Sequence, residues 1–184
     1  GIDEAAFYGP KLDIQYKNVF GKEDTIVTIQ IDMLLAEKFG MYYVDTDGQK
    51  KLPYIIHRTS LGCYERTLAY ILETFAGALP LWLSPEQVRL LPIADRHHAY
   101  AKEVAAKLES MGMRVSVDDR SEKIGYKIRE AQLEKIPYML LVGDKEIEDG
   151  AVSIRKRGEG DLGAKSVDEF IASALADIAS KVIW

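Results

Sequence analysis

The chain has 184 residues, 47% of them hydrophobic and 29% charged, which excludes a disordered tail, a collagen-like chain and a disulfide-stapled miniprotein. The net charge of −5 argues against nonspecific coating of nucleic acid or of an anionic membrane, but it leaves room for a local basic face. No apolar stretch approaches the ~20 residues that span a bilayer, so we expect no membrane partner. The single cysteine, Cys63, favours a reducing compartment, the cytoplasm.

The first third of the chain predicts an antiparallel sheet. Apolar and polar residues alternate over residues 12–16, and a turn leads into a second strand at residues 25–32. Residues 41–45 and 50–57 predict a second hairpin joined through Asp47-Gly48, with Pro53 at an edge or a strand start.

From Leu61 on, the period changes to that of a helix. One helical stripe is formed by the apolar residues Tyr64, Leu68, Ile71, Leu72 and Phe75. Gly77 suits the end of this helix, and Pro80 and Pro85 bracket a short connector. We therefore expect one domain over residues 1–80 and a second over residues 81–184.

The second domain alternates strands and helices. Strands are predicted at residues 88–93, 114–117, 138–142 and 151–155, and helices at residues 97–111 and 123–135 and after a capping box at Ser166 and Glu169. In the first of these helices, one apolar side runs from Ala101 to Met111. Short links between such units imply a mixed, mostly parallel sheet covered by helices, so the fold class is α/β, or α+β for the whole chain.

Two features of the first domain could carry chemistry. Thr28, Gln30 and Asp32 project from one strand face and suit a small polar ligand, although a solvated sheet face gives the same pattern. His57 could ligate a metal, but zinc needs three or four ligands. Further ligands could come only from Cys63, His97 and His98, and the two histidines lie in the other domain.

Arg66 lies close to a helix N-terminus, where the helix dipole disfavours a cation. An anionic partner such as a phosphate would explain it, and so would a plain Glu–Arg helix surface. The chain has no phosphate loop, dinucleotide fingerprint or serine-hydrolase elbow.

In the second domain, residues 118–123 follow a strand and open a helix, at the sheet edge where α/β folds bind ligands. Arg155 leaves another strand, and Glu146 lies in the loop before it. Ser, Glu and Arg side chains can read the edges of unpaired bases. A charged surface that serves only solubility is an equally good interpretation of these residues.

Five segments occur in an order that is specific when taken together. They are Ala-Phe-Tyr-Gly-Pro-Lys at 6–11, Thr-Ile-Gln-Ile-Asp at 28–32, Ile-His-Arg at 56–58, Gly-Cys-Tyr-Glu-Arg at 62–66 and Asp-Arg-Ser-Glu-Lys-Ile-Gly-Tyr-Lys-Ile-Arg-Glu at 119–130. The chain resembles, over essentially its whole length, the C-terminal portion of bacterial threonyl-tRNA synthetases. Prolyl- and glycyl-tRNA synthetases share the second domain's architecture, but the first and third segments are similar to the threonyl enzymes.

The resemblance implies a remnant of a class II antiparallel catalytic sheet with its third motif, followed by an α/β anticodon-binding domain. Its parent would be a cytoplasmic homodimer that activates threonine with ATP and Mg²⁺ and transfers it to threonine tRNA. The family's zinc ion recognises threonine through one Cys and two His. His57 would be the last of these ligands, and the other two would lie upstream of Gly1. Because the zinc ion coordinates the side-chain hydroxyl of threonine, the site would reject valine, which has no hydroxyl.

The resemblance also implies roles for individual residues. Tyr8 and Gln30 match the threonine pocket, and Lys11 matches a lysine near the reacting phosphate. Thr28 and Arg66 match ATP contacts. The anticodon-reading positions are Ser121, Glu146 and Arg155.

Three residues depart from the family pattern. Thr25 stands where the family often has a Gln, which weakens one ATP contact. Cys63 replaces a Ser of the threonine pocket, and Ser121 replaces an Asn of some members.

Motifs 1 and 2, two zinc ligands and any editing domain are missing from this sequence. We therefore expect the chain alone to be inactive, although its parent is an enzyme. The alternative is a non-catalytic RNA-binding or regulatory protein derived from a synthetase. A nucleotide-binding α/β module is a weaker third hypothesis, because the Gly-rich phosphate loop is missing.

Overall fold

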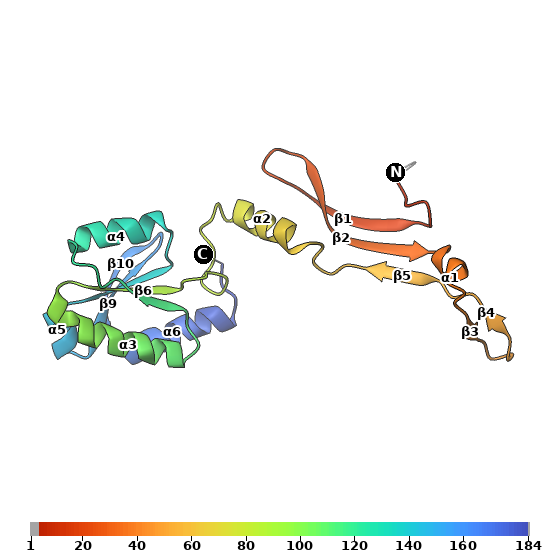
Figure 1. Ribbon diagram of the computed structural model, residues 1–184. Helices are drawn as coiled ribbons and strands as arrows, with labels where there is room; N and C mark the ends of the chain where they lie inside the picture. Colours follow the sequence, from red (N-terminus) through yellow and green to blue (C-terminus); the bar gives the residue numbers. More distant parts are fainter. Residues whose placement is uncertain (1–3, 184) are drawn as a thin grey trace. The chain divides into compact units, whose positions relative to one another are not determined.

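The computed structural model describes residues 4–183 and has two compact units, Gly1–Thr74 (unit 1) and Phe75–Trp184 (unit 2) (Figure 1). Each unit is built around its own sheet. Within residues 4–183, no helix combines the length and the apolar character that a membrane span needs.

Unit 1 contains the predicted antiparallel sheet. Its strands are β1 (Lys11–Lys17), β2 (Glu23–Asp32) and β5 (Ile55–Arg58), in the order β1-β2-β5. In the central strand β2, Gln30 lies opposite Lys11 of β1 on one side and opposite His57 of β5 on the other. Three segments far apart in the sequence therefore meet at Gln30.

The prediction of one strand over residues 50–57 is wrong. The hairpin consists only of β3 (Tyr43–Val44) and β4 (Lys50–Lys51), and β5 is a separate strand that pairs with β2. Pro53 lies between β4 and β5, and a proline has no N–H to donate to a ladder. The chain can therefore leave one strand pair there and join another.

A short helix after β2 was not predicted. α1 (Leu35–Lys38) has only four residues, too few for a periodic pattern. Asp32 stabilises its start, because Oδ1 accepts hydrogen bonds from the main-chain N–H groups of Leu34 and Leu35, both at 2.9 Å.

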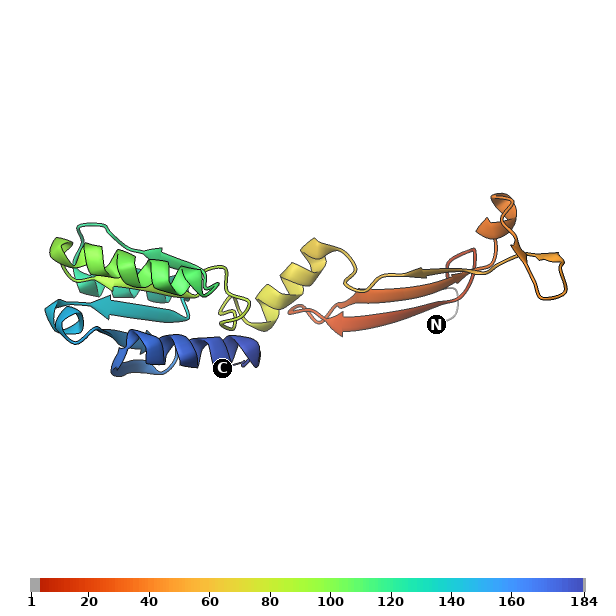
Figure 2. The same ribbon diagram turned by 90° about the horizontal axis from the view of Figure 1, so that it is seen from below.

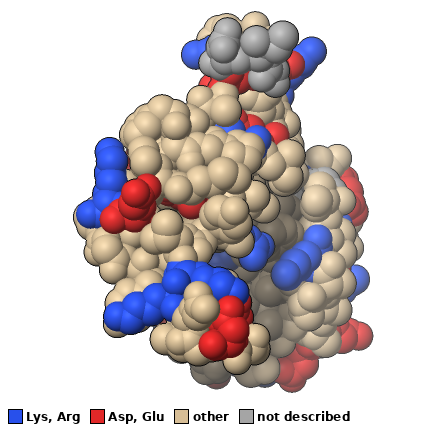
Figure 3. Space-filling model, turned by 90° about the vertical axis from the view of Figure 1, so that its right-hand side faces the viewer, with Lys and Arg blue, Asp and Glu red and all other residues tan. Residues whose placement is uncertain are grey.

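Unit 1 has almost no core of its own. Of its described residues, only Asp32 and Ala36 are buried. The predicted helix is present as α2 (Tyr64–Thr74), but its apolar stripe is open, with Leu68 55% exposed. Figure 3 likewise shows a face with acidic and basic side chains in small groups and much uncharged surface between them. Such a unit depends on other surfaces to cover its apolar side chains.

Unit 2 contains a five-stranded mixed sheet in the order β10-β9-β8-β6-β7. The strands are β6 (Val88–Pro92), β7 (Val115–Val117), β8 (Tyr138–Val142), β9 (Ala151–Lys156) and β10 (Gly160–Ser166). β6 pairs in parallel with β7 and β8, whereas β9 is antiparallel to β8 and β10. The expected mixed α/β architecture is confirmed, and β10 is an addition to the predicted elements.

Helices cover both faces of this sheet (Figures 1 and 2). α3 (His98–Ser110), which follows the 3₁₀ turn η1 (Asp95–His97), lies with α6 (Val167–Ala179) on one face, and α4 (Ile124–Leu133) covers the other. The short helix α5 (Asp144–Glu148) follows β8.

The alternation of side chains along the strands produces two hydrophobic clusters. Leu90 and Leu140 pack toward α3 and α6 in the larger cluster, whereas Leu91 and Met139 pack toward α4 in the smaller one. Met111, expected on the apolar side of α3, is 49% exposed because the helix ends before it. The core of the chain thus lies in unit 2.

Candidate functional site

The polar face of β2 is linked by hydrogen bonds to the segments beside it. Tyr8 donates its hydroxyl hydrogen to Oε1 of Gln30 over 2.7 Å. Thr28 donates to Oδ1 of Asp13 over 2.8 Å, and Lys11 Nζ lies 2.7 Å from Oδ2 of the same carboxylate. This ion pair lowers the pKa of the Asp13 carboxyl and raises that of the Lys11 ammonium. Hydrogen bonds and an ion pair therefore hold the polar side chains of this face in place.

The structure brings together three residues that the sequence pointed to. Gln30 lies opposite His57, and the rings of Tyr8 and His57 meet edge to face with their centroids 5.9 Å apart. Lys11 and Thr28 join this group through Asp13. Within residues 4–183, no hydrogen bond connects Cys63 to Gln30 or His57.

His57 is oriented by a buried carboxylate. Its Nε2 lies 3.0 Å from Oδ2 of Asp32, whose side chain is fully buried, while the His57 side chain is 43% exposed. Burial disfavours the charged form of Asp32, but hydrogen bonds from the Leu35 N–H, His57 and the Leu34 N–H outweigh it and hold the pKa of the carboxyl below its ordinary value. Asp32 is therefore an acceptor, and the neutral imidazole carries its proton on Nε2.

This arrangement fits a metal ligand. A ligating histidine commonly donates its other ring N–H to a carboxylate, and here Nδ1 has no partner among the described residues. The same residues hold no group of three His, Cys, Asp or Glu side chains that could bind a metal ion. His57 could thus supply one ligand to a site whose other ligands come from elsewhere.

We expect Asp32→Asn to move the proton on the His57 ring. An Asn can still accept from the Leu34 and Leu35 N–H groups through its oxygen, and its NH₂ group can donate to Nε2 of His57. Nε2 must then be the acceptor, so the ring proton moves to Nδ1. ¹⁵N NMR of the ring in alkaline solution reports the tautomer. Asp13→Asn, on the same sheet but away from His57, is the control and should leave the tautomer unchanged.

Arg66 and Cys63 lie at the start of α2, next to β2. Arg66 donates from Nη1 to the carbonyl oxygen of Thr25 over 2.8 Å. Gly62 has φ +64°, and a Cβ there would lie 2.5 Å from the carbonyl oxygen of Ile26. This close approach to the backbone holds the helix start against β2, with the exposed thiol of Cys63 beside it.

The carboxyl edge of the parallel strands in unit 2 forms a hollow of about 410 Å³. Ser121 lines it, in the loop between β7 and α4, as expected for a ligand site of an α/β sheet. Arg120 lines it too, but its guanidinium is held 2.7 Å from Asp118 and 2.6 Å from Glu130. Hydrogen bonds from Arg120 lower the pKa of the Asp118 carboxyl.

The two other predicted anticodon positions are not brought into this hollow. Glu146 lies in α5 and accepts a hydrogen bond from the main-chain N–H of Gly143 over 2.9 Å, which caps the helix. Arg155 lies opposite Met139, toward the beginning of β8, and lines a separate hollow of about 110 Å³. Its Nε is buried and has no hydrogen-bond partner in the part of the chain that the structure describes.

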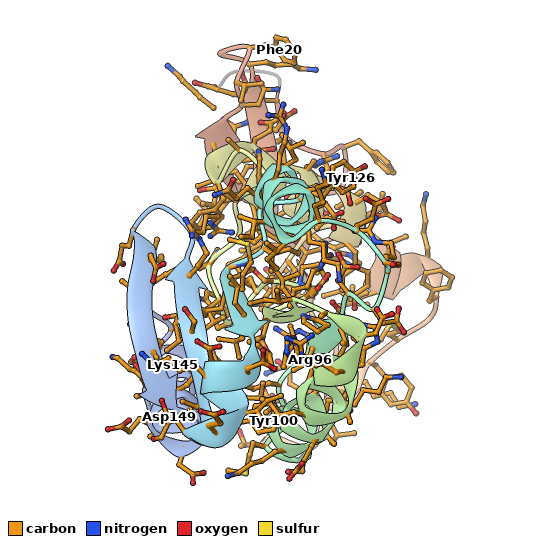
Figure 4. The ribbon with its side chains drawn as sticks, turned by 90° about the vertical axis from the view of Figure 1, so that its left-hand side faces the viewer. Phe20, Arg96, Tyr100, Tyr126, Lys145 and Asp149 are labelled. Atoms are coloured by element: carbon orange, nitrogen blue, oxygen red, sulfur yellow. The ribbon has the colours of Figure 1, made fainter. Side chains whose placement is uncertain are left out.

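A charged cluster connects η1 with the start of α5. Asp144 accepts from Arg96 Nε at 2.8 Å and lies 2.9 Å from Nε2 of the buried His97 (Arg96 is labelled in Figure 4). Nδ1 of His97 in turn accepts from the N–H of Ala94 at 3.0 Å. Arg96 first, and His97 second, hold the pKa of the Asp144 carboxyl well below its usual range.

This cluster predicts an acid-sensitive stability. A carboxyl whose pKa is lower in the folded state stabilises the fold at neutral pH, and the contribution is lost as the pH falls below about 4, the pKa of an unfolded Asp. We expect Asp144→Asn to lower the melting temperature at pH 7 and to reduce its further fall between about pH 5 and pH 3. Asp149→Asn, an exposed change at the other end of α5, is the matched control for thermal melts at each pH.

Each half of the chain matches a family model. Residues 2–75 match the tRNA synthetase class II core domain (G, H, P, S and T), and residues 87–176 match the anticodon binding domain. A threonine–tRNA ligase of Clostridium perfringens strain SM101 is 60% identical over 179 residues, 97% of this chain. The chain belongs to the threonyl-tRNA synthetase family.

Further relatives support this assignment. Threonine–tRNA ligases of Clostridium botulinum strain Eklund 17B and of Caldanaerobacter subterraneus are 58% and 51% identical over 97% and 98% of the chain. The crystal structure of the RNA binding domain of threonyl-tRNA synthetase from Cryptosporidium parvum is similar with a TM-score of 0.83 and 38% identity, over 94% of this chain and 44% of that one. The chain spans only 28% of the length of each of these bacterial synthetases.

Sequence reasoning missed the supporting roles of Asp13 and Asp32. Asp13 alternates with apolar residues in β1 and looks like any solvent-facing strand residue. A signal for Asp32 did exist, because an Asp directly before an apolar run is typical of a helix start.

Proposed function

We propose that this chain is the part of a threonyl-tRNA synthetase that completes the amino-acid and ATP site and reads the anticodon. The parent enzyme would activate threonine with ATP and join it to threonine tRNA. The 60% identity to a threonine–tRNA ligase over 97% of the chain carries the proposal. We propose a cytoplasmic homodimer for the parent, in line with the family and the single cysteine.

In unit 1, Gln30 and Tyr8 would contact threonine. Their mutual hydrogen bond fixes the Gln30 oxygen, which leaves its NH₂ group to donate to a substrate. Cys63 would line the same pocket as a weak donor.

Zinc, when bound, would supply a Lewis acid for the amine and the hydroxyl of threonine. His57 would hold it through Nδ1, and Asp32 keeps that nitrogen free of a proton. The remaining Cys and His ligands would come from the rest of the parent enzyme.

ATP, with its Mg²⁺, would be held on the same face of the sheet. Thr28 and Arg66 would contact ATP, and Lys11 would lie near the reacting phosphate, where cations offset the growing negative charge. Lys11 and Thr28 share the Asp13 carboxylate, which fixes both side chains before a ligand arrives.

We expect the 184-residue chain alone to be inactive. Its described part lacks a complete set of metal ligands, and the apolar residues of unit 1 are largely uncovered. Threonine-dependent ATP–pyrophosphate exchange by the purified chain should therefore be undetectable, and measurable exchange would overturn this expectation.

In unit 2, Ser121, Glu146 and Arg155 would read bases of the anticodon. The test is binding of the chain to a threonine tRNA transcript, and to the same transcript with its second and third anticodon bases changed, at two salt concentrations. We expect each base change to cost about 1–3 kcal/mol. Equal, salt-sensitive binding to all transcripts would mean phosphate attraction alone and would remove the three assigned roles.

A further inference from the structure

One lysine of unit 2 is buried at the edge where Ser121 lies. Lys127, in the first half of α4, is 2% exposed and is among the largest fully buried side chains of the described chain. Lysine is almost never buried in this way unless its ammonium is paired. Its position therefore needs a physical explanation.

The ammonium of Lys127 joins two strand ends. Nζ donates to the main-chain carbonyl oxygens of Pro92, at 3.2 Å, and of Asp118, at 2.9 Å. Pro92 is the last residue of β6, and Asp118 directly follows β7. Lys127 thus ties together the carboxyl ends of two adjacent parallel strands from the helix that covers them.

No carboxylate of the described residues forms an ion pair with this ammonium. The side chain of Asp118 is turned to Arg120, which donates from Nε at 2.9 Å and from Nη2 at 2.7 Å. An ammonium has three N–H groups, and two of them have acceptors among the described residues. Lys127 and Ser121 both line the hollow at this edge, so the strand ends that Lys127 anchors belong to the wall of that hollow.

The loop from Asp118 to Lys123 is held at Asp118 and at Arg120, whose half-exposed guanidinium lies against Asp118 and Glu130. The main-chain N–H of Asp118 donates to the carbonyl oxygen of Leu90 over 2.9 Å, and the carbonyl oxygen of Asp118 accepts from Lys127 Nζ. Ser121 lies three residues further on, and its side chain is exposed. The hydrogen bond from Lys127 to the Asp118 carbonyl is fully buried, whereas the contacts that Arg120 makes just before Ser121 are partly open to solvent.

We propose that Lys127 is a positioning residue for anticodon reading: by clamping the carbonyls of Pro92 and Asp118, it holds the 118–123 loop in the shape that presents Ser121 to a base. The proposal rests on the proposed function of unit 2. In this proposal, a buried helix residue maintains the fixed loop geometry that base discrimination requires.

The test uses the full 184-residue chain with Lys127→Met and Lys123→Met. Both variants remove one positive charge from the same hollow, but Lys123 is exposed and makes no clamp. Binding of matched and anticodon-changed threonine tRNA transcripts is measured as above. We expect Lys123→Met to weaken binding to both transcripts equally, and Lys127→Met to reduce the discrimination between them on the order of tenfold.

A double variant separates positioning from direct contact. If Lys127 acts through the loop, Ser121→Ala/Lys127→Met should lose no more discrimination than the larger of the two single changes. Additive losses would overturn the proposal, and so would a Lys127→Met chain that discriminates like the unchanged chain. If the unchanged chain itself does not discriminate, the proposed function fails instead.

Lys127→Met removes the buried donor to the carbonyl oxygens of Pro92 and Asp118 and so destabilises unit 2, which is why circular dichroism melting accompanies each variant. If Lys127→Met does not fold, NMR of the unchanged chain tests the proposal instead. We expect the Lys127 ammonium signal and the main-chain amides of residues 118–123 to shift more with a matched anticodon stem-loop than with a base-changed one. Equal or absent shifts would overturn the proposal.

Discussion

Phe170→Ala is expected to lower the free energy of unfolding of unit 2 by about 3–5 kcal/mol. Phe170 lies in α6, is 2% exposed and meets the ring of Tyr138 edge to face, with centroids 5.2 Å apart. Removing the ring takes away buried apolar surface and leaves a cavity between helix and sheet. Urea denaturation followed by circular dichroism measures the loss.

Phe170→Ala should also lower the pKa of Tyr138. Burial raises the pKa of Tyr138 to about 12, and opening the space beside it should let this pKa fall toward 10. Leu68→Ala, on the 55% exposed stripe of α2, is the control and should cost less than about 1 kcal/mol. A Phe170→Ala chain as stable as this control would contradict the assignment of the core to unit 2.

Gly62→Ala is expected to disrupt the contact between β2 and α2 in unit 1. Its φ of +64° costs an L-residue about 1–2 kcal/mol, and its Cβ would lie 2.5 Å from the carbonyl oxygen of Ile26, an overlap that adds about 1–3 kcal/mol. Gly21→Ala has a similar φ of +75° but open space around it, so it should cost only the first amount.

Hydrogen exchange distinguishes these two glycine variants. Amides of β2 and of the first turn of α2 should exchange faster in Gly62→Ala than in Gly21→Ala, since only the former must move two main-chain segments apart. Equal rates would mean that the approach of Gly62 to β2 is not needed for the fold. If Arg66 contacts ATP as proposed, Gly62→Ala should also lower the ATP affinity of the parent enzyme, because Arg66 lies in the first turn of α2.

The core of unit 2 could be predicted because its strands are short apolar runs with clear ends. β6 and β8 fit the fully buried strands of a parallel sheet, and α3 showed its buried side as a helical period. β10 was missed because Gly160 and Gly163 interrupt its pattern, and its residues are mostly exposed. α5 was missed because a five-residue helix with no buried residue leaves no periodic signal.

The candidate site could be predicted only within each strand. The i, i+2, i+4 spacing places Thr28, Gln30 and Asp32 on one face, but the sequence does not contain the register that brings Asp13 to Thr28 and His57 to Asp32. Register depends on pairing between distant segments and on the bulge in β2, where Ile26 is the extra residue opposite the Ile14–Gln15 step of β1. The partners of each predicted residue therefore needed the structure.

The central position of β2 restricts how this part of the protein can change in evolution. Inserting or deleting one residue between Ile26 and Ile31 would shift side chains of β2 to the opposite face of the sheet, and Gln30 would lose its position opposite both Lys11 and His57. The turn between β1 and β2, where Phe20 is 89% exposed, can lengthen without such an effect. Natural variation in length should therefore gather in this turn, whereas β2 itself changes only by substitution.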